Sequence, residues 1–189
     1  MRDAEIRGAL VTLLRDQHGH DPSTLIRHEL GLCAGRSRVD VAVINGDISG
    51  FEIKSDEDKL ARLAGQVDMY GRVLDRAALV TTDRYVAAAL TLIPAWWSVW
   101  IAKQDNGIVA LANLRAGHRN ASVEPFAVAQ LLWREEAMAE LRARELHRGL
   151  SGVRRWFVWQ RLAESVELEE LQAIVRGALR ARRNWPGGQ

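Results

Sequence analysis

The pattern of apolar and polar positions changes its period along the first part of the chain, and each change indicates a new helix or strand. Residues 3–17 repeat apolar side chains at helical spacing, whereas residues 39–44 and 48–55 have the character of strands. Between these two strands, Asn45-Gly46 is a strong hairpin signal. The other expected elements are a strand over 23–30, a helix over 58–75, a strand over 77–82, a short helix over 85–92, and strands over 97–102 and 108–114. This order predicts an α/β fold in which helices flank a central mixed sheet.

Beyond Pro125 the pattern is helical only, and it contains no further strand signal. Helices are expected over 126–147, 151–165 and 167–182. We therefore divide the chain into a sheet-containing domain over residues 1–120, an all-helical C-terminal extension over 121–183 and a loose, flexible tail over 184–189.

The register of the hairpin decides whether two acidic residues can meet. A two-residue turn would place Asp40 and Glu52 on opposite faces, whereas a three-residue turn over residues 45–47 would place them opposite each other. In the second register one face carries Val39, Val41, Val43, Phe51 and Ile53, and the other carries Asp40, Ala42, Ile44, Ile48, Gly50, Glu52 and Lys54. Because a slip by one residue would bury charged side chains and expose apolar ones, the pattern favours the three-residue turn.

This register gathers three charged side chains at one point. Glu52 and Lys54 project from the same side of their strand, and Asp40 lies opposite Glu52. Cβ atoms of opposed residues are about 5 Å apart, and two carboxylates this close repel each other unless a cation lies between them. Mg²⁺ suits the position, because it binds one or two carboxylates together with waters and substrate phosphates. The small residues Ala42 and Gly50 would leave room beside it.

A metal held by two carboxylates next to an ammonium group is suited to cutting a phosphodiester bond. The spacing alone leaves a second interpretation open. In that interpretation the two strands face solvent, Asp40 and Glu52 are merely hydrated, and Lys54 bridges them.

The segment Val39-Asp40, followed after the hairpin by Glu52-Ile53-Lys54, resembles the central motifs of the PD-(D/E)XK nuclease superfamily, which has the restriction-endonuclease-like fold. The resemblance covers residues 3–85 and is nearest to a group of largely uncharacterised bacterial and phage members. It implies a core in the order αβββαβ. Val39 stands where the named motif has proline.

Residue by residue, the resemblance implies that Asp40 and Glu52 bind the metal and that the backbone carbonyl of Ile53 is a third ligand. It implies that Lys54 orients or activates the attacking water, or stabilises charge developing on the phosphate. Gln66, in the helix that follows, would help position the substrate or Lys54.

Many members of the superfamily take a further acid from the first helix. Glu5 is the candidate in this chain and Glu29 its rival, although the position of Glu5 at the edge of its helix favours simple solvation. From the resemblance we expect a Mg²⁺-dependent nuclease acting on DNA, with Mn²⁺ able to substitute. The alternative is a nuclease-like module that binds nucleic acid or protein, in a regulatory role, without cutting.

The composition sets limits on location and partners. The 189 residues are 48% hydrophobic and contain no apolar run near the roughly 20 residues needed to span a bilayer, so we expect no membrane association. The acidic start of the chain does not suit a signal peptide. Cys33 is the one cysteine and cannot form an intrachain disulfide, which favours a reducing cytoplasm.

The basic residues do not by themselves identify a partner. Net charge is only +2, and 23 of the 26 basic residues are Arg, which suits phosphate binding but also follows from genomic base composition. Trp156 and Trp159 follow Arg154-Arg155, an arrangement that can stack on unpaired bases but more often packs helices against a sheet. The C-terminal helices are therefore candidates for binding substrate, a protein partner or a second copy in a homodimer.

Overall fold

The computed structural model describes residues 1–185. Of the tail expected over 184–189, residues 186–189 therefore lie outside the described residues. The first part of the chain forms α1 (Asp3–His18), β1 (Leu25–Leu32), a 3-10 turn η1 (Cys33–Gly35), β2 (Ser37–Ile44), β3 (Ile48–Lys54), a 3-10 turn η2 (Leu60–Arg62), α2 (Leu63–Gly71) and β4 (Arg76–Thr81). The second part forms α3 (Asp83–Leu90), β5 (Ser98–Asp105), β6 (Ile108–Arg115), α4 (Pro125–Ala129), α5 (Arg134–Ala143), α6 (Arg155–Ser165) and α7 (Leu168–Ala181).

The strands form one six-stranded mixed sheet, and their order in space is their order in the chain. The pairs β3–β4 and β4–β5 are parallel, and the other three pairs are antiparallel. All residues of β4 except the first, Arg76, are buried, as is typical of a strand covered on both faces. The predicted α/β class, with a helix-flanked mixed sheet and a helical C-terminal region, is confirmed.

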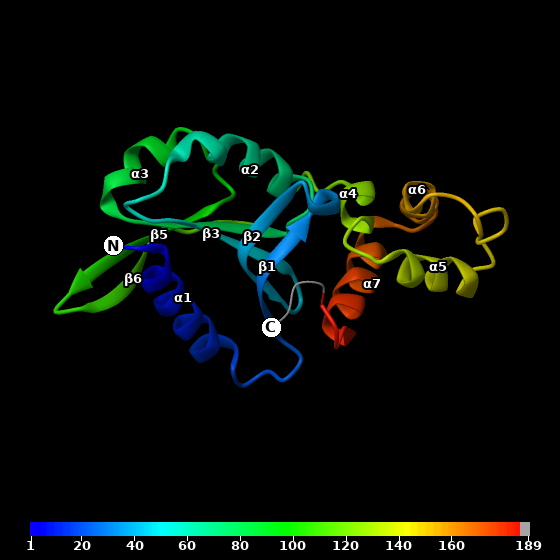
Figure 1. Ribbon diagram of the computed structural model, residues 1–189, viewed down its shortest axis with the longest axis horizontal. Coiled ribbons are helices and arrows are strands. Elements are labelled where there is room, and N and C mark those ends of the chain that lie inside the picture. The colour runs from blue at the N-terminus through cyan, green and yellow to red at the C-terminus, as the bar shows by residue number, and fades with distance from the viewer. Residues whose placement is uncertain (186–189) are drawn as a thin grey trace.

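Helices cover both faces of the sheet (Figure 1). Helix α1 packs Ile6, Leu10 and Leu14 against one face, where they meet Val41 and Ile53. Helices α2 and α3 lie over the opposite face, and α4 to α7 gather at the end of the sheet formed by β1 and β2. One cluster of buried residues joins these later helices to the sheet, so no gap in the core separates the sheet from the helical region.

We expected only one face of the β2–β3 hairpin to be apolar, but helices cover both faces and both carry buried apolar side chains. Ala42, Ile44 and Ile48, expected on the open face, are buried in the larger core. Val39 packs in that core too, whereas Val41 packs in the core beneath α1. Between these two residues the β1–β2 ladder omits the pair of residues 29 and 40. The room expected beside Gly50 is also absent: a Cβ atom there would lie 2.4 Å from Leu74 Cδ1.

The helix expected over 126–147 is wrong as one element, since α4 ends at Ala129 and α5 begins at Arg134. The break has two causes, a tertiary contact and a local helix cap. The Leu132 carbonyl accepts a hydrogen bond from Trp159 Nε1 at 3.0 Å, and the Glu136 side chain caps the next helix by accepting from the Trp133 amide at 2.7 Å. The helix expected over 58–75 is likewise shorter, because a 3-10 turn precedes α2.

A buried carboxylate ties the last helix to the sheet. Asp75, which is 1% exposed, accepts hydrogen bonds from the Ile48 amide at 2.8 Å and from Gln172 Nε2 of α7 at 2.7 Å. Arg119 Nη2 lies 3.3 Å from the same side chain. Asp75 therefore acts as a fixed connection between β3, α7 and the segment that follows β6.

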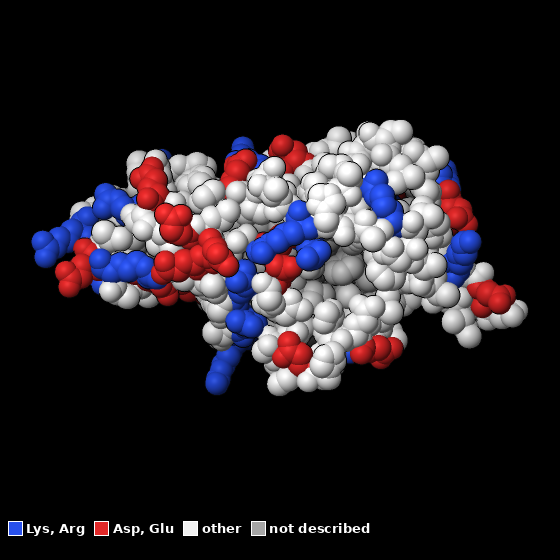
Figure 2. Space-filling view, turned by 180° about the vertical axis from the view of Figure 1, so that it is seen from behind, with Lys and Arg blue, Asp and Glu red and all other residues white. Residues whose placement is uncertain are grey.

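The surface carries charges of both signs. Figure 2 shows Lys and Arg side chains interspersed with Asp and Glu over the face seen from behind, in keeping with the small net charge of +2. Any electrostatic attraction for a ligand must therefore come from local clusters. No helix within residues 1–185 is long and apolar enough to cross a membrane.

The close contact at Gly50 gives a test of the packing. Replacing Gly50 with Ala should lower the free energy of unfolding by about 1–3 kcal/mol, because the new methyl group overlaps Leu74 in a filled core. Gly8→Ala is the matched control: its Cβ would have no neighbour within 4 Å, so it should stabilise α1 by about 0.5–1 kcal/mol. Urea unfolding of both variants measures the difference, and equal stabilities would contradict the packing described.

Candidate active site

A cleft of about 940 Å³ opens where β2, β3 and α2 meet the start of α1. All four side chains predicted to be functional line it: Asp40, Glu52, Lys54 and Gln66. Its other charged lining residues are Asp3, Glu29, Arg36, Arg38, Asp58 and Arg62. The structure therefore brings the predicted set to one place and adds several charges that the motif did not include.

The hairpin has the predicted register, in which Ile44 pairs with Ile48. The regular ladder runs to the pair Val41–Phe51, and the next residues outward are Asp40 and Glu52. At that point the Asp40 side chain replaces the backbone ladder, because its Oδ2 accepts the Ile53 amide hydrogen at 2.8 Å. Ending the ladder here opens the strands at the acidic pair.

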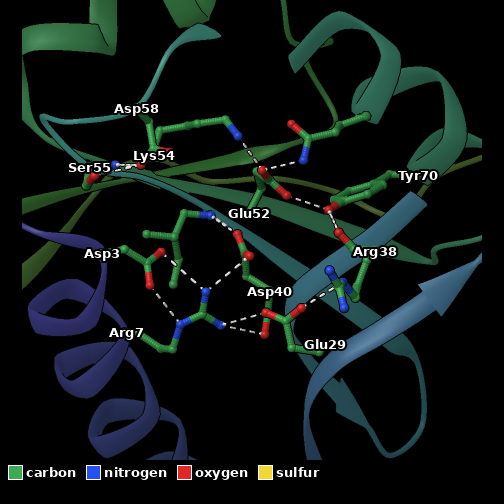
Figure 3. Close-up of polar contacts among 12 residues, drawn as sticks. Asp3, Arg7, Glu29, Arg38, Asp40, Glu52, Lys54, Ser55, Asp58 and Tyr70 are labelled. Atoms are coloured by element: carbon green, nitrogen blue, oxygen red, sulfur yellow. Dashed lines mark hydrogen bonds and ion pairs between the residues drawn. The ribbon is translucent and has the colours of Figure 1, made fainter. Parts of the chain in front are cut away.

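Glu52 is the centre of the hydrogen-bond network shown in Figure 3. The residue is only 2% exposed, and its Oε1 accepts from Lys54 Nζ at 2.5 Å and from Gln66 Nε2 at 2.5 Å. The Tyr70 hydroxyl reaches Oε2 of the same carboxylate and also lies 2.8 Å from the Arg38 carbonyl. Its single proton serves one of these two acceptors at a time.

Burial raises the pKa of Glu52, and repulsion from Asp40 raises it further, while Lys54 and Tyr70 act in the opposite direction. The pKa of Tyr70 is also raised, first by burial and then by the charge of Glu52, so its hydroxyl stays neutral and donates. The interpretation in which Glu52 is a hydrated surface group is therefore wrong. A carboxylate with a perturbed pKa at the wall of a cleft is a typical feature of functional sites.

Asp40 has a different environment, set by Arg7 of α1. Arg7 Nη2 lies 3.1 Å from Asp40 Oδ1, and its Nη1 donates to the Asp40 carbonyl at 2.8 Å. Asp3, one helical turn earlier, accepts from Arg7 Nε at 3.0 Å and orients the guanidinium. The Asp40 side chain is 22% exposed, so it borders the cleft, whereas Glu52 lies beneath its wall.

The two candidates for a further acid have different positions. Glu5 does not line the cleft; it accepts a hydrogen bond from the Arg2 amide at 2.7 Å at the start of α1. Glu29 does line the cleft, and its carboxylate lies 2.7 Å from Arg38 Nε and 3.7 Å from Arg7 Nη1. The first helix contributes Asp3 and Arg7 to the region instead.

Arg7 and Tyr70 are the residues that sequence reasoning missed. The spacing of Asp3 and Arg7, four residues apart on one helix, indicates an ion pair between them. No local pattern indicates that Arg7 also reaches a strand 33 residues away. Tyr70 follows Gln66 by one helical turn, so the two share a face of α2, and that spacing was the available signal.

The donors around the acidic pair fit a small, hard cation. The Ile53 amide points to Asp40, and the carbonyl of a strand residue points to the same edge as its amide, so the Ile53 carbonyl faces the acidic pair as well. Gln66 Oε1 is buried without a hydrogen-bond partner. Within residues 1–185 no group of three or more His, Cys, Asp or Glu side chains gathers where it could hold a metal ion.

Comparison with known proteins gives one family and one distant structural likeness. The family model described as Bacteriophage P4 protein cII matches residues 1–184. Protein cII of Enterobacteria phage P4 is 23% identical over 188 residues, which make up 96% of this chain and 68% of that protein. Among solved structures, the SPO1766 protein of unknown function from Silicibacter pomeroyi aligns at a TM-score of 0.48 and 18% identity, covering 82% of this chain and 96% of its own.

The buried pair of Glu52 and Lys54 gives a pH-dependent prediction. In Lys54→Met the pKa of Glu52 should rise further, because the carboxylate loses its cation while staying buried. A carboxyl group whose pKa is raised by folding destabilises the folded state once the pH exceeds its unfolded value of about 4.5. The variant should therefore be close to wild type in stability at pH 5 and about 3–5 kcal/mol less stable at pH 8.

Urea unfolding at both pH values measures this effect. Lys103→Met is the control, since Lys103 is exposed on β5 and forms no ion pair within residues 1–185. Parallel pH profiles for the two variants would contradict the assignment of Lys54 as the counter-ion of Glu52.

Proposed function

The chain belongs to the Bacteriophage P4 protein cII family, and we propose that it is a metal-dependent nuclease that hydrolyses phosphodiester bonds in DNA. One observation carries the proposal. A buried carboxylate, Glu52, is held by Lys54, Gln66 and Tyr70 beside a second carboxylate, Asp40, in a cleft. Burying such a charge costs stability, and replacing it with apolar side chains is often neutral or stabilising, so a functional role accounts for its presence better than a structural one.

The order of elements supports a restriction-endonuclease-like topology as part of the same proposal. Apart from the two 3-10 turns, the chain runs α1-β1-β2-β3-α2-β4, which is the αβββαβ order of that fold. The two acids lie at the point where β2 and β3 separate, and α2 supplies Gln66 and Tyr70 from above.

In the proposed mechanism Asp40, Glu52 and the Ile53 carbonyl hold Mg²⁺, or Mn²⁺ in its place. When bound, the metal polarises a phosphoryl oxygen and lowers the pKa of a water. The Lys54 ammonium, fixed against Glu52, orients the attacking water and stabilises negative charge that develops on the phosphate. Gln66 donates to Glu52 through its amide nitrogen and directs its unpartnered oxygen to the water or the substrate.

Two further residues keep the carboxylates in place. Tyr70 orients the Glu52 carboxylate from the protein interior, and Arg7 orients Asp40 from α1. Arg38 and Arg62 line the same cleft, and in the proposed mechanism they hold the phosphates that flank the bond to be cut.

A second candidate function is a nuclease-like module that binds nucleic acid or protein without cutting. It is favoured by the ion pairs that already neutralise both acids: Arg7 lies 3.1 Å from Asp40, and Lys54 lies 2.5 Å from Glu52. Such a module would bind its partner in the presence of a chelator, and the Glu52→Gln substitution would leave that binding intact.

Metal binding is tested by melting temperature in the presence of Mn²⁺. Wild type should be stabilised by about 2.7 kcal/mol when the free metal is 100-fold above its dissociation constant, and Glu52→Gln should lose this gain. Asp75→Asn is the matched control, since it also removes a buried, hydrogen-bonded carboxylate but lies outside the cleft. If Mn²⁺ raises the melting temperature of all three proteins equally, metal binding at Glu52 is excluded.

Cleavage is tested with single-stranded, duplex and branched DNA in Mg²⁺ or Mn²⁺. Asp40→Asn, Glu52→Gln and Lys54→Met should each lower the rate by at least about 100-fold, because the first two remove a metal ligand and the third removes the ammonium group that stabilises charge on the phosphate. Asp75→Asn should retain activity at temperatures below its melting point. If every DNA substrate remains intact, the nuclease proposal is contradicted and the binding module is favoured.

A further inference from the structure

The cleft is not isolated, because two further cavities share its walls. One, here called the Arg–Trp cavity, has a volume of about 800 Å³ and is formed largely by the segment around the start of α6. The other, the middle cavity, has a volume of about 550 Å³. The Arg–Trp cavity shares Arg36 with the cleft and Ala34 with the middle cavity, and the middle cavity shares Gly31 and Gly35 with the cleft. The three cavities share lining residues around η1 and are together called the path.

The Arg–Trp cavity is lined by five arginines, three of which have no counter-ion within residues 1–185, whereas Arg134 lies 3.9 Å from Glu135. Its charged lining residues are Arg36, Arg72, Arg134, Arg154 and Arg155, with no acid among them. Within residues 1–185, Arg36, Arg154 and Arg155 are exposed and form no ion pair, whereas Arg72 is paired with Glu124 at 2.8 Å. Three free guanidinium groups in a hollow favour an anionic ligand.

Aromatic side chains lie beside these cations. Trp156 lines the Arg–Trp cavity and is 48% exposed, with Phe126 supporting its ring edge-on at a centroid distance of 4.5 Å. Trp159, by contrast, is only 3% exposed, and it packs α6 against the core beneath Arg155. The prediction that these tryptophans pack helices is therefore confirmed for Trp159, while Trp156 retains a face open to a ligand.

The loop that joins the three cavities has an unusual backbone. Cys33 and Ala34 have φ angles of 49° and 58°, in the left-handed region that residues other than glycine and asparagine rarely adopt. Glu29, at the other wall of the middle cavity, has a φ of 57°. Backbone strain of this kind occurs preferentially at ligand-binding sites.

From these observations we propose that the path from the Arg–Trp cavity to the cleft binds a single strand of nucleic acid, with phosphates on the free arginines and an unpaired base on Trp156. Each cavity has the volume of a small-molecule site, enough to enclose about one or two nucleotides. Bases inside a duplex are stacked on each other and cannot reach a tryptophan face. The inference rests on the proposed function in one respect, which is that the strand leads to the cleft where it would be cut. Binding of the strand itself needs no metal.

The proposal is tested by fluorescence anisotropy of the full chain with a labelled single-stranded DNA of about 12 nucleotides, in excess chelator. The wild-type protein should bind this strand at least about tenfold more tightly than a duplex of the same sequence, and a free nucleoside monophosphate should compete only weakly. Binding of the duplex with equal affinity would overturn the proposal, and so would competition by the mononucleotide as strong as that by the strand.

Substitutions assign the binding to the path. The double variant Arg154→Ala/Arg155→Ala should bind about tenfold more weakly, and its salt dependence should be shallower by about 0.7 for each phosphate that the variant no longer neutralises. The matched control is Arg142→Ala/Arg148→Ala, an exposed pair in the same helical region that lines none of the three cavities. Equal affinities for the two double variants would overturn the proposal.

Trp156 is tested with two substitutions, because it also packs on Phe126. Trp156→Ala should weaken binding at least about fivefold, and Trp156→Phe should keep most of the affinity, because a phenyl ring still stacks on a base. If Trp156→Ala and Trp156→Phe bind the strand with equal affinity, stacking of a base at this position is excluded.

The outcome is separable from that of the nuclease proposal. Glu52→Gln should abolish cleavage, whereas Arg154→Ala/Arg155→Ala should weaken strand binding in chelator. If the strand binds through Arg154 and Arg155 but is never cut, the nuclease proposal fails and this inference stands. If duplex DNA is cut through Glu52 and the arginine variants cut normally, the inference fails and the nuclease proposal stands.

Discussion

The buried ion pair between Glu52 and Lys54 is the constraint on which the rest of the site depends. Taking two charges out of water costs several kcal/mol per ion, and their attraction offsets this only when the remaining hydrogen-bonding capacity is satisfied. Gln66 and Tyr70 of α2 make the remaining hydrogen bonds to Glu52. These bonds fix both the rotation of α2 about its axis and its distance from β3. In this position α2 forms one wall of the cleft.

Local patterns in the sequence predicted most of the arrangement of Asp40, Glu52 and Lys54. Alternation along residues 39–44 and 48–54 predicted the pairing of Ile44 with Ile48, and the ladder runs from that pair to Val41–Phe51, one residue short of Asp40 and Glu52. The period of the following helix placed Gln66 on a face that looks into the cleft. These features depend on residues near each other in the chain, where periodicity and turn chemistry are strong.

Contacts between distant segments could not be predicted in this way. The pairing of Arg7 with Asp40 depends on where α1 crosses the sheet, and that position is set by packing of Ile6 and Leu10 rather than by any motif. The second covered face of the hairpin, the place of Val39 and the break before α5 have the same origin. In each case a tertiary contact overrode a pattern that is correct over a few residues.

The agreement between strand order and chain order has a consequence for how the protein is made. Each strand from β1 to β6 pairs with the strand just synthesised, so a nascent chain leaving the ribosome can extend its sheet at one edge without rearranging earlier pairs. The docking of α7 joins remote parts of the chain, since Gln172 meets Asp75 across 97 residues. The helical end would then be the last part to dock, onto a sheet that is already complete.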